Sequence, residues 1–367
     1  MRDPRVERMA KVLVNYSLGL KPGDFFVIRG GEVSAPLIRA VYQEALQVGA
    51  YPEVMVGLPG IAEIYLKTAN DEQLEFVSPL ARIPLEKADA LLSVLGETNV
   101  RALSGVDPAR QALRARATSE LSKIMMDRAA NGELRWCLTQ FPTNADAQEA
   151  NMSLSDYEEF VFAACGLNEE DAVAYWQRVR QEQEAMVTRL EAVDTLRIVG
   201  EDTDLTLCVG GRRWESCAGE ANFPDGEVFT GPVEDSAEGH IRFSFPGIFR
   251  GQLIEDIRLT FEGGRVVSAT ARHGEELLQA LLDTDPGARF LGEVGIGTNY
   301  GIDRHTRNML FDEKIGGTVH LALGAGYPET GSKNESAIHW DMLCDLRSGG
   351  EIHADGALIY KDGKFVF

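Results

Sequence analysis

Cysteine is scarce in this chain of 367 residues, and the cysteines it has form no pattern. The five cysteines lie at positions 137, 165, 208, 217 and 344, and no two of them form a Cys-x-x-Cys pair. An odd count without paired spacing argues against a disulfide framework and against a thiolate metal site. We therefore expect reduced thiols that are mostly buried.

Long hydrophobic runs and positive charge are also scarce. No apolar run reaches the roughly 18 residues that a membrane helix needs. The start of the chain, residues 1–8, is charged where a signal peptide would be apolar. We therefore expect a cytoplasmic protein that does not bind a membrane. The net charge of −21 repels phosphate backbones, which argues against nucleic acid as a partner.

The first half of the chain lacks the signatures of nucleotide binding. Its first predicted strand is followed by residues 29–34, whose sequence RGGEVS does not have the spacing G-x-G-x-x-G. No P-loop sequence occurs either. We therefore interpret this half as a structural domain.

Strand and helix patterns alternate through this half. Residues 24–28 and 51–56 are predicted strands, and residues 35–47 between them have apolar side chains at helical spacing. Such a unit closes by a right-handed crossover into a parallel sheet. Further strands are predicted at 88–95 and 134–138, a helix that opens with a capping box at Ser155 to Glu158, and a long surface helix at 168–190.

After residue 191 the composition changes to short strands separated by turns. Strands are predicted at 196–199, 205–209 and 239–245, and hairpins at 259–271 and 358–367. The predicted fold class is α/β, with two domains. We expect residues 1–191 to form an N-terminal α/β domain with a parallel sheet, and residues 192–367 to form a β-rich α+β catalytic domain.

His339 and Asp341 are the first candidate metal ligands. Residues two positions apart do not share a helix face, but they share a strand face. On a strand, Ile338, Trp340 and Met342 would face a core. His339 and Asp341 would then project together from the other side, as two ligands of one cation would. A solvent-exposed polar face is the alternative for a single His-x-Asp pattern.

His320 lies in a second predicted strand, residues 317–324. Positions 319, 321 and 323 are apolar and would form one face. The other face places His320 beside Ala322 and Gly324, and glycine in a strand often marks the close approach of a ligand. From this pattern alone, a buried core histidine is an equally good interpretation.

Three glutamates complete the candidate cluster. Glu227 and Glu293 each follow a glycine and lead a short apolar stretch, where a buried carboxylate needs a metal, arginine or lysine as its partner. With Glu313 and Asp341, the cluster has four negative charges, which two divalent cations would balance. Mixed nitrogen and oxygen ligands suit Zn, Co or Mn, with Mg possible. Two ions about 3.5–4 Å apart are a known arrangement for hydrolysing peptides.

These motifs resemble those of the thermophilic-type metalloaminopeptidase family, whose members are often called leucyl aminopeptidases. The matching stretches are GEVFTGP at 226–232, FLGE at 290–293, LFDE at 310–313, HLALG at 320–324 with Tyr327, and HWD at 339–341. Residues 21–24 and the predicted helix before Gly49 are similar to the opening of the family. The resemblance therefore covers nearly the whole chain.

The resemblance implies a homodimer that removes N-terminal residues from short peptides with a free N-terminus. It implies six metal ligands and one catalytic phenol: Glu227, Glu293, Glu313, His320, His339 and Asp341, with Tyr327 as the phenol. A bridging hydroxide would attack the scissile carbonyl, and Glu293 or Glu313 would pass the proton to the leaving amine. The chain is shorter than many members. Glu313 and His320 are seven positions apart, where some members place the two closer.

Two other interpretations stay open. A mononuclear non-haem iron oxygenase would use His339 and Asp341 as part of a facial triad, for which only His353 lies downstream. A non-catalytic binding module would keep its function when metal is stripped. Metal stoichiometry separates the two enzymes, because two ions per chain favour the peptidase and one iron favours the oxygenase.

Overall fold

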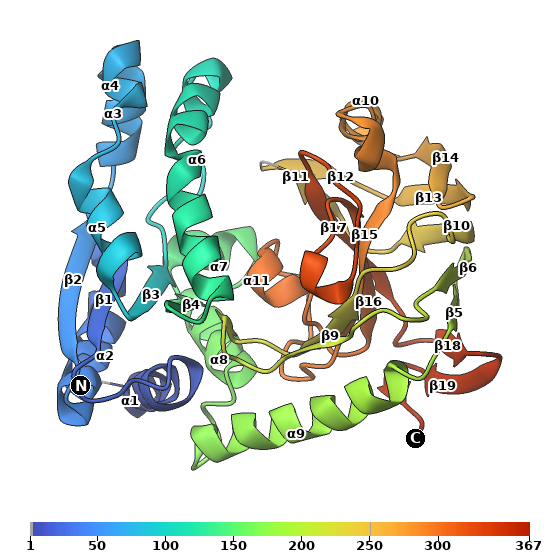
Figure 1. The fold of residues 1–367 in the computed structure, drawn as a ribbon, viewed down its shortest axis with the longest axis horizontal. Coiled ribbons are helices and arrows are strands. Elements are labelled where there is room, and N and C mark those ends of the chain that lie inside the picture. Colours follow the sequence, from blue (N-terminus) through green and yellow to red (C-terminus); the bar gives the residue numbers. More distant parts are fainter. Residues whose placement is uncertain (1–2, 250) are drawn as a thin grey trace. The chain divides into compact units, whose positions relative to one another are not determined.

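The chain forms two compact units, and each is described by itself (Figure 1). The computed structural model describes residues 3–249 and 251–367. The first unit comprises residues 1–175 and 219–224, and the second comprises residues 176–218 and 225–367. The sequence placed a boundary at residue 191, directly after the end of helix α9 (Ala172–Leu190). That boundary stays a prediction about independently folding segments, and limited proteolysis would test it.

A five-stranded parallel sheet forms the first unit, with strand order β2-β1-β3-β4-β8. Every pairing in it is parallel, as the alternation of predicted strands and helices indicated. The strands are β1 (Phe25–Gly31), β2 (Tyr51–Gly57), β3 (Ala90–Leu95), β4 (Arg135–Gln140) and β8 (Asn222–Phe223). The short strand β8 comes from the segment that returns to this unit, and sequence patterns did not predict it.

The helices of this unit precede its first strand or connect its strands. They are α1 (Pro4–Val12), α2 (Ala35–Val48), α3 (Ile61–Thr68), α4 (Asp71–Glu75), α5 (Pro79–Lys87), α6 (Pro108–Ala130), α7 (Asn144–Glu149) and α8 (Leu154–Ala164), with single-turn segments Leu13–Ser17 and Glu32–Ser34. The predicted capping box at Ser155 is wrong: α8 begins after Ser153, whose hydroxyl accepts a hydrogen bond from the amide of Asp156. Helix α6 was not predicted, because none of its residues is fully buried and its apolar periodicity is weak.

Two antiparallel sheets and a short hairpin form the second unit. The eight-stranded sheet has the order β14-β13-β10-β6-β5-β18-β19-β20, and the five-stranded sheet has the order β17-β16-β15-β9-β7. The larger sheet contains β5 (Thr195–Gly200), β6 (Thr203–Cys208), β10 (Glu238–Phe243), β13 (Ile257–Glu262), β14 (Arg265–Thr270), β18 (Glu351–Ala354), β19 (Ala357–Lys361) and β20 (Lys364–Phe365). The smaller contains β7 (Glu215–Cys217), β9 (Glu227–Thr230), β15 (Leu291–Gly297), β16 (Thr318–Gly324) and β17 (His339–Asp345).

The remaining elements of the second unit are short. They are the hairpin β11 (Gly247–Phe249) and β12 (Gln252–Ile254), helices α10 (Glu275–Leu282) and α11 (Met309–Asp312), and the 3₁₀ turns Pro286–Arg289 and Pro328–Thr330. The predicted fold class is confirmed: a parallel α/β region is followed by an antiparallel β-rich region.

One apolar core joins the two larger sheets of the second unit. Side chains of β5, β6, β10 and β13 pack in the same buried cluster as side chains of β15, β16 and β17. Val319, Leu321 and Leu323 of β16 belong to this cluster, as do Trp340 and Met342 of β17. Because side chains alternate along a strand, the residues between them point to the opposite face of the smaller sheet.

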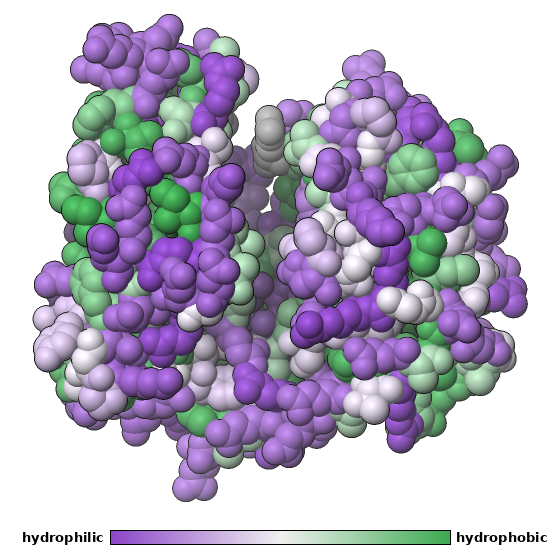
Figure 2. Space-filling view, in the orientation of Figure 1, coloured by the Kyte–Doolittle hydropathy of each residue, from purple (hydrophilic) through white to green (hydrophobic). Residues whose placement is uncertain are grey.

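The surface of the first unit carries several large apolar side chains. Figure 2 shows hydrophobic residues between hydrophilic ones around α5. Leu58, Ile61, Ile64, Phe76 and Leu80, which precede or belong to α3 to α5, are each more than half exposed. Among the described residues, no helix has the length and apolar character to cross a membrane.

Candidate metal centre

Five of the six predicted ligands lie on strands of the five-stranded antiparallel sheet, on the face that points away from the apolar core: Glu227, Glu293, His320, His339 and Asp341. Across the strands, Glu293 pairs with Ala322, and Ala322 pairs with Asp341. Gly295 lies opposite His320, and a side chain there would overlap the imidazole, so this position requires glycine. Small residues thus leave room on this face, and ionisable side chains surround that room.

A first group of possible ligands consists of Glu227, Glu293 and His320. His320 Nε2 lies 3.1 Å from Glu293 Oε1 and 3.2 Å from Glu227 Oε2. Each of the three residues is buried, and His320 has no exposed surface. The ligand atoms of the three lie within 4.8 Å of one another, which is close enough for one cation to contact all of them.

A second group consists of Glu293, His339 and Asp341. His339 Nε2 lies 3.3 Å from Glu293 Oε2 and 3.6 Å from Asp341 Oδ2. His339 Nδ1 lies 2.7 Å from the carbonyl oxygen of Ala325, so it can donate its proton there and leave Nε2 as the ligand atom. Glu293 belongs to both groups, with one carboxylate oxygen facing each histidine.

Opposite charges dominate the pKa values of these buried side chains. Burial would lower the pKa of an imidazole, yet Glu293 and Glu227 raise that of His320 to about 10, and Glu293 with Asp341 raises that of His339 to about 9. Burial would raise the pKa of Glu293, yet the two imidazoles lower it to about 2. Burial and Glu293 raise the pKa of Asp341 to about 7. Without a metal, protons therefore supply the positive charge that the carboxylates need.

The donor set fits divalent metal ions. Glu227 Oε2 is buried and accepts no hydrogen bond from any described residue. It nevertheless faces the Nε2 atom of His320 at 3.2 Å. Buried polar atoms without a partner are costly, and a cation between the carboxylate and the imidazole would satisfy both. Carboxylate oxygens and imidazole nitrogens together suit Zn and its transition-metal neighbours.

Glu313 differs from the other predicted ligands. It follows α11 rather than lying on a strand, and it belongs to none of the groups of possible metal ligands found among the described residues. Its carboxylate accepts a hydrogen bond from the ammonium group of Lys314. The structure thus brings Glu227, Glu293, His320, His339 and Asp341 together. It pairs Glu313 with the ammonium group of Lys314.

Lys314 is a charged residue of the site that the sequence analysis missed. Its side chain has no exposed surface, and its Nζ lies 3.2 Å from Glu227 Oε1 and 3.9 Å from Asp225 Oδ1. Burial would lower the pKa of this ammonium, yet Glu227, Glu313 and Asp225 raise it well above its ordinary value. Its position directly after Glu313 was the only signal in the sequence.

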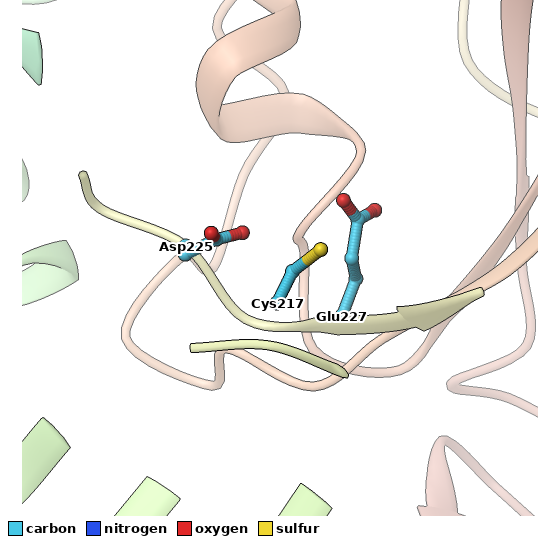
Figure 3. A group of neighbouring side chains, drawn as sticks. All are labelled: Cys217, Asp225 and Glu227. Atoms are coloured by element: carbon cyan, nitrogen blue, oxygen red, sulfur yellow. The ribbon is translucent and has the colours of Figure 1, made fainter. Parts of the chain in front are cut away.

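A third group of possible ligands, Cys217, Asp225 and Glu227, was also missed. Their side chains project to the same side of two neighbouring segments, with the thiol between the two carboxylates (Figure 3). Asp225 precedes Glu227 by two positions, the same spacing that directed attention to His339 and Asp341. Burial and the carboxylates of Asp225 and Glu227 raise the pKa of the Cys217 thiol well above its ordinary value, and a neutral thiol is a poor metal ligand.

Tyr327 lies at the edge of the second group. Its ring contacts those of Phe229 and His339 edge to face, with centroid distances of 5.4 Å and 5.1 Å. Burial and the carboxylates of Glu293 and Asp341 raise the pKa of its phenol, which stays protonated and can donate a hydrogen bond. The side chain is 37% exposed, so part of the ring is accessible to solvent.

Comparisons with known proteins find relatives that align over nearly the whole chain. Aminopeptidase 2 of Geobacillus stearothermophilus is 28% identical over 408 aligned residues, which cover 99% of this chain and 95% of that protein. Aminopeptidase T of Thermus thermophilus is 28% identical over 397 residues, with 98% and 95% covered. The solved structure of wild-type AmpT from Thermus thermophilus superposes with a TM-score of 0.87 at 26% identity, and 99% of each chain is covered.

The family itself follows from a match over almost the full length. The thermophilic metalloprotease family, M29, matches residues 2–365. This match confirms the family that the motifs resembled, and nothing in the comparisons supports the iron oxygenase interpretation. The chain belongs to the thermophilic metalloprotease family M29.

Proposed function

We propose that this chain is a metal-dependent aminopeptidase that releases N-terminal residues from short peptides at a dinuclear metal site. The observation that carries this proposal is the position of Glu293 between two histidines, with one oxygen 3.1 Å from His320 Nε2 and the other 3.3 Å from His339 Nε2. A carboxylate in this position can bridge two cations. Both named relatives are aminopeptidases, which supports the same reaction here.

We assign the predicted ligands to two positions that share Glu293. Glu227 and His320 complete one position, and His339 and Asp341 complete the other. Glu313 lies outside both and is either a further ligand or the carboxylate that passes a proton to the leaving amine, a role for which Glu293 is the alternative. When bound, two ions of Zn, Co, Mn or Mg would polarise the scissile carbonyl and acidify the attacking water.

The side chains around this site have their own parts in the reaction. Ala325 orients His339 by accepting a hydrogen bond from Nδ1. The protonated phenol of Tyr327 would donate a hydrogen bond to the oxyanion that develops on the carbonyl. The likeness to two named aminopeptidases supports a substrate with an unblocked α-amino group.

Metal removal and substrate blocking test the proposal together. Chelation should abolish hydrolysis of a leucine-headed dipeptide, and Zn, Co or Mn should restore it. Metal analysis should find two ions per chain. The N-acetylated dipeptide should resist cleavage, because its amino group is neutral and blocked. Equal turnover of the free and acetylated substrates would reject an aminopeptidase, and one ion per chain would reject the dinuclear site.

We further propose a homodimer in the cytoplasm. Exposed apolar side chains on the first unit support self-association, since Leu80 is 71% and Tyr51 is 68% exposed. The mass of the purified protein in solution tests the dimer. Fractionation of its native cells tests the location.

A further inference from the structure

A buried ammonium group occupies one side of the candidate metal site. Lys314 has no exposed surface, and its Nζ lies 3.2 Å from Glu227 Oε1. The same ammonium lies 3.9 Å from Asp225 Oδ1 and donates a hydrogen bond to Glu313. A lysine is almost never fully buried unless it is paired, and here three carboxylates surround it. Two of the three, Glu227 and Glu313, are predicted metal ligands.

This ammonium explains the third group of possible ligands. Cys217, Asp225 and Glu227 come close enough to hold a cation (Figure 3). Lys314 already brings a positive charge to the two carboxylates of that group. The ammonium of Lys314 therefore takes the place that a metal ion would have in this group. A metal ion bound there would be repelled by the ammonium at short range.

The two carboxylate oxygens of Glu227 face different partners, the ammonium of Lys314 and the first metal position. Its Oε1 faces Lys314 at 3.2 Å, and its Oε2 faces His320 at 3.2 Å. Only Oε2 is left for a metal ion, so Glu227 would bind with one oxygen. The second position, formed by Glu293, His339 and Asp341, has no lysine or arginine among the ion pairs described for it.

We infer that Lys314 is a positioning residue that makes the two metal positions unequal, weakening the position at Glu227 and His320 relative to the position at His339 and Asp341. This inference rests on the proposed dinuclear site. The ammonium repels an ion bound at Glu227 Oε2, because both are positive and lie on the same carboxylate. In the metal-free protein it does the opposite and stabilises the fold, because it offsets the repulsion among Glu227, Glu313 and Asp225.

The two effects have opposite signs, which separates this role from a merely structural one. Removing the charge of Lys314 should lower the stability of the metal-free protein and raise the metal affinity of the weaker position. If Lys314 only maintained the shape of the site, its substitution would lower both the stability of the metal-free protein and the metal affinity. Lys314→Met removes the charge and the hydrogen bonds, whereas Lys314→Gln removes the charge but keeps a hydrogen-bond donor on a shorter side chain.

Zinc titration against a chromophoric chelator tests the inference on the full-length protein. The unmodified protein should bind two ions with affinities at least about tenfold apart. Lys314→Met and Lys314→Gln should both narrow that gap by about tenfold or more through tighter binding of the weaker ion, while the melting temperature in EDTA falls. Lys361→Met is the matched control, because this half-exposed lysine pairs with Glu351 in the same unit. It should leave both affinities unchanged.

Variants that keep only one of the two metal positions identify which ion the charge of Lys314 affects. In His339→Ala, the remaining ion sits at Glu227 and His320, and Lys314→Gln should tighten it by about tenfold. In His320→Ala, the remaining ion sits at His339 and Asp341, and the same substitution should change its affinity much less. If both backgrounds respond equally, the charge acts on the whole site and the inference is wrong.

Asp225→Asn keeps the inference testable if the Lys314 variants do not fold. It leaves the ammonium in place with one carboxylate fewer, so Glu227 should be held more tightly and the weaker ion should bind less well. A gain in affinity here, or a loss in the Lys314 variants, would overturn the inference while two ions still bind. A single ion in the unmodified protein would instead reject the dinuclear function itself.

Discussion

The two five-stranded sheets of this protein bury their residues in different ways. In the parallel sheet, β1 buries three of its seven residues, Phe26, Val27 and Ile28, all of them apolar. In the antiparallel sheet, all seven residues of β15 and all seven of β16 are buried, and these include Glu293 and His320. One face of that sheet meets an apolar core, so the opposite face buries ionisable groups. Buried ionisable groups with shifted pKa values mark a functional site.

The parallel sheet has its own cavity, but the chemistry there is weaker. A cavity of about 1010 Å³ lies at the carboxyl ends of β1, β2 and β3, with Arg29, Glu32 and Glu97 among its lining residues. Ligands of α/β sheets usually bind at this edge. Its lining contains no histidine or cysteine among the residues described, whereas the antiparallel sheet has two histidines among carboxylates. Donor chemistry, rather than cavity size, therefore selects the antiparallel sheet as the candidate metal centre.

Substitution of the shared carboxylate should have the largest effect. Glu293→Gln keeps the shape of the side chain but removes the charge that both groups use. We expect the loss of at least one metal ion per chain and a fall in kcat/KM of about 10³-fold or more, since a metal contributes several kcal/mol to transition-state stabilisation. Metal analysis and initial rates measure both.

Glu97→Gln is the control in the other unit. Glu97 lines the cavity of the parallel sheet, where burial and Asp146 raise its pKa. Its substitution should leave metal content unchanged. Full metal occupancy in Glu293→Gln, or metal loss in Glu97→Gln, would contradict the assignment of the metal site to the antiparallel sheet.

Removal of the Tyr327 hydroxyl should come next in size. Tyr327→Phe keeps the ring contacts with Phe229 and His339. Losing one hydrogen bond to a developing oxyanion typically costs about 10²–10³ in kcat, or roughly 3–4 kcal/mol. We expect that fall with KM and metal content nearly unchanged, because the ground-state carbonyl has little charge. Tyr51→Phe, on the exposed strand β2, is the matched control, and an unchanged kcat in Tyr327→Phe would make the phenol structural.

A matched pair of core substitutions compares the sheets directly. Leu91 in β3 and Leu321 in β16 have no exposed surface, and each lies inside its sheet. Each leucine-to-alanine change should destabilise its unit by about 2–5 kcal/mol through the cavity it leaves. Only Leu321→Ala should also weaken metal binding, because the adjacent residue His320 would lose its fixed position. Urea denaturation and metal titration measure the two effects, and equal metal loss in both variants would contradict the assignment.

An exposed ion pair should give the smallest effect. Arg197 and Asp204 approach to 2.7 Å on the eight-stranded sheet, and their side chains are 53% and 44% exposed. Exposed pairs contribute about 0–1 kcal/mol, and salt screens them. Arg197→Ala should therefore change the free energy of unfolding by less than about 1 kcal/mol, with normal metal content. A larger loss in urea denaturation would show that this sheet depends on surface charge.

Local patterns predicted the strands of the site because strand geometry is set by neighbours in sequence. Alternation alone placed His339 and Asp341 on one face of β17 and His320 on a strand face beside Ala322 and Gly324. The capping of α8 was misplaced by two residues, since Ser153 and Ser155 are both suitable caps and only the fold selects one. Helix α6 was not predicted, because none of its residues is buried and the sequence therefore shows no helical repeat of apolar side chains.

The sequence by itself determined the α/β and β-rich order of the fold, the strands that carry the histidines, and the motifs of the family. Only the tertiary structure decided that Glu293 stands between two histidines, that Glu313 pairs with Lys314, and that Lys314 is fully buried. Strand alternation is a local property that a few neighbouring residues fix. The partner of a buried charge is chosen among residues far apart in sequence, such as Lys314 and Glu227, so it depends on how strands meet and what surrounds them.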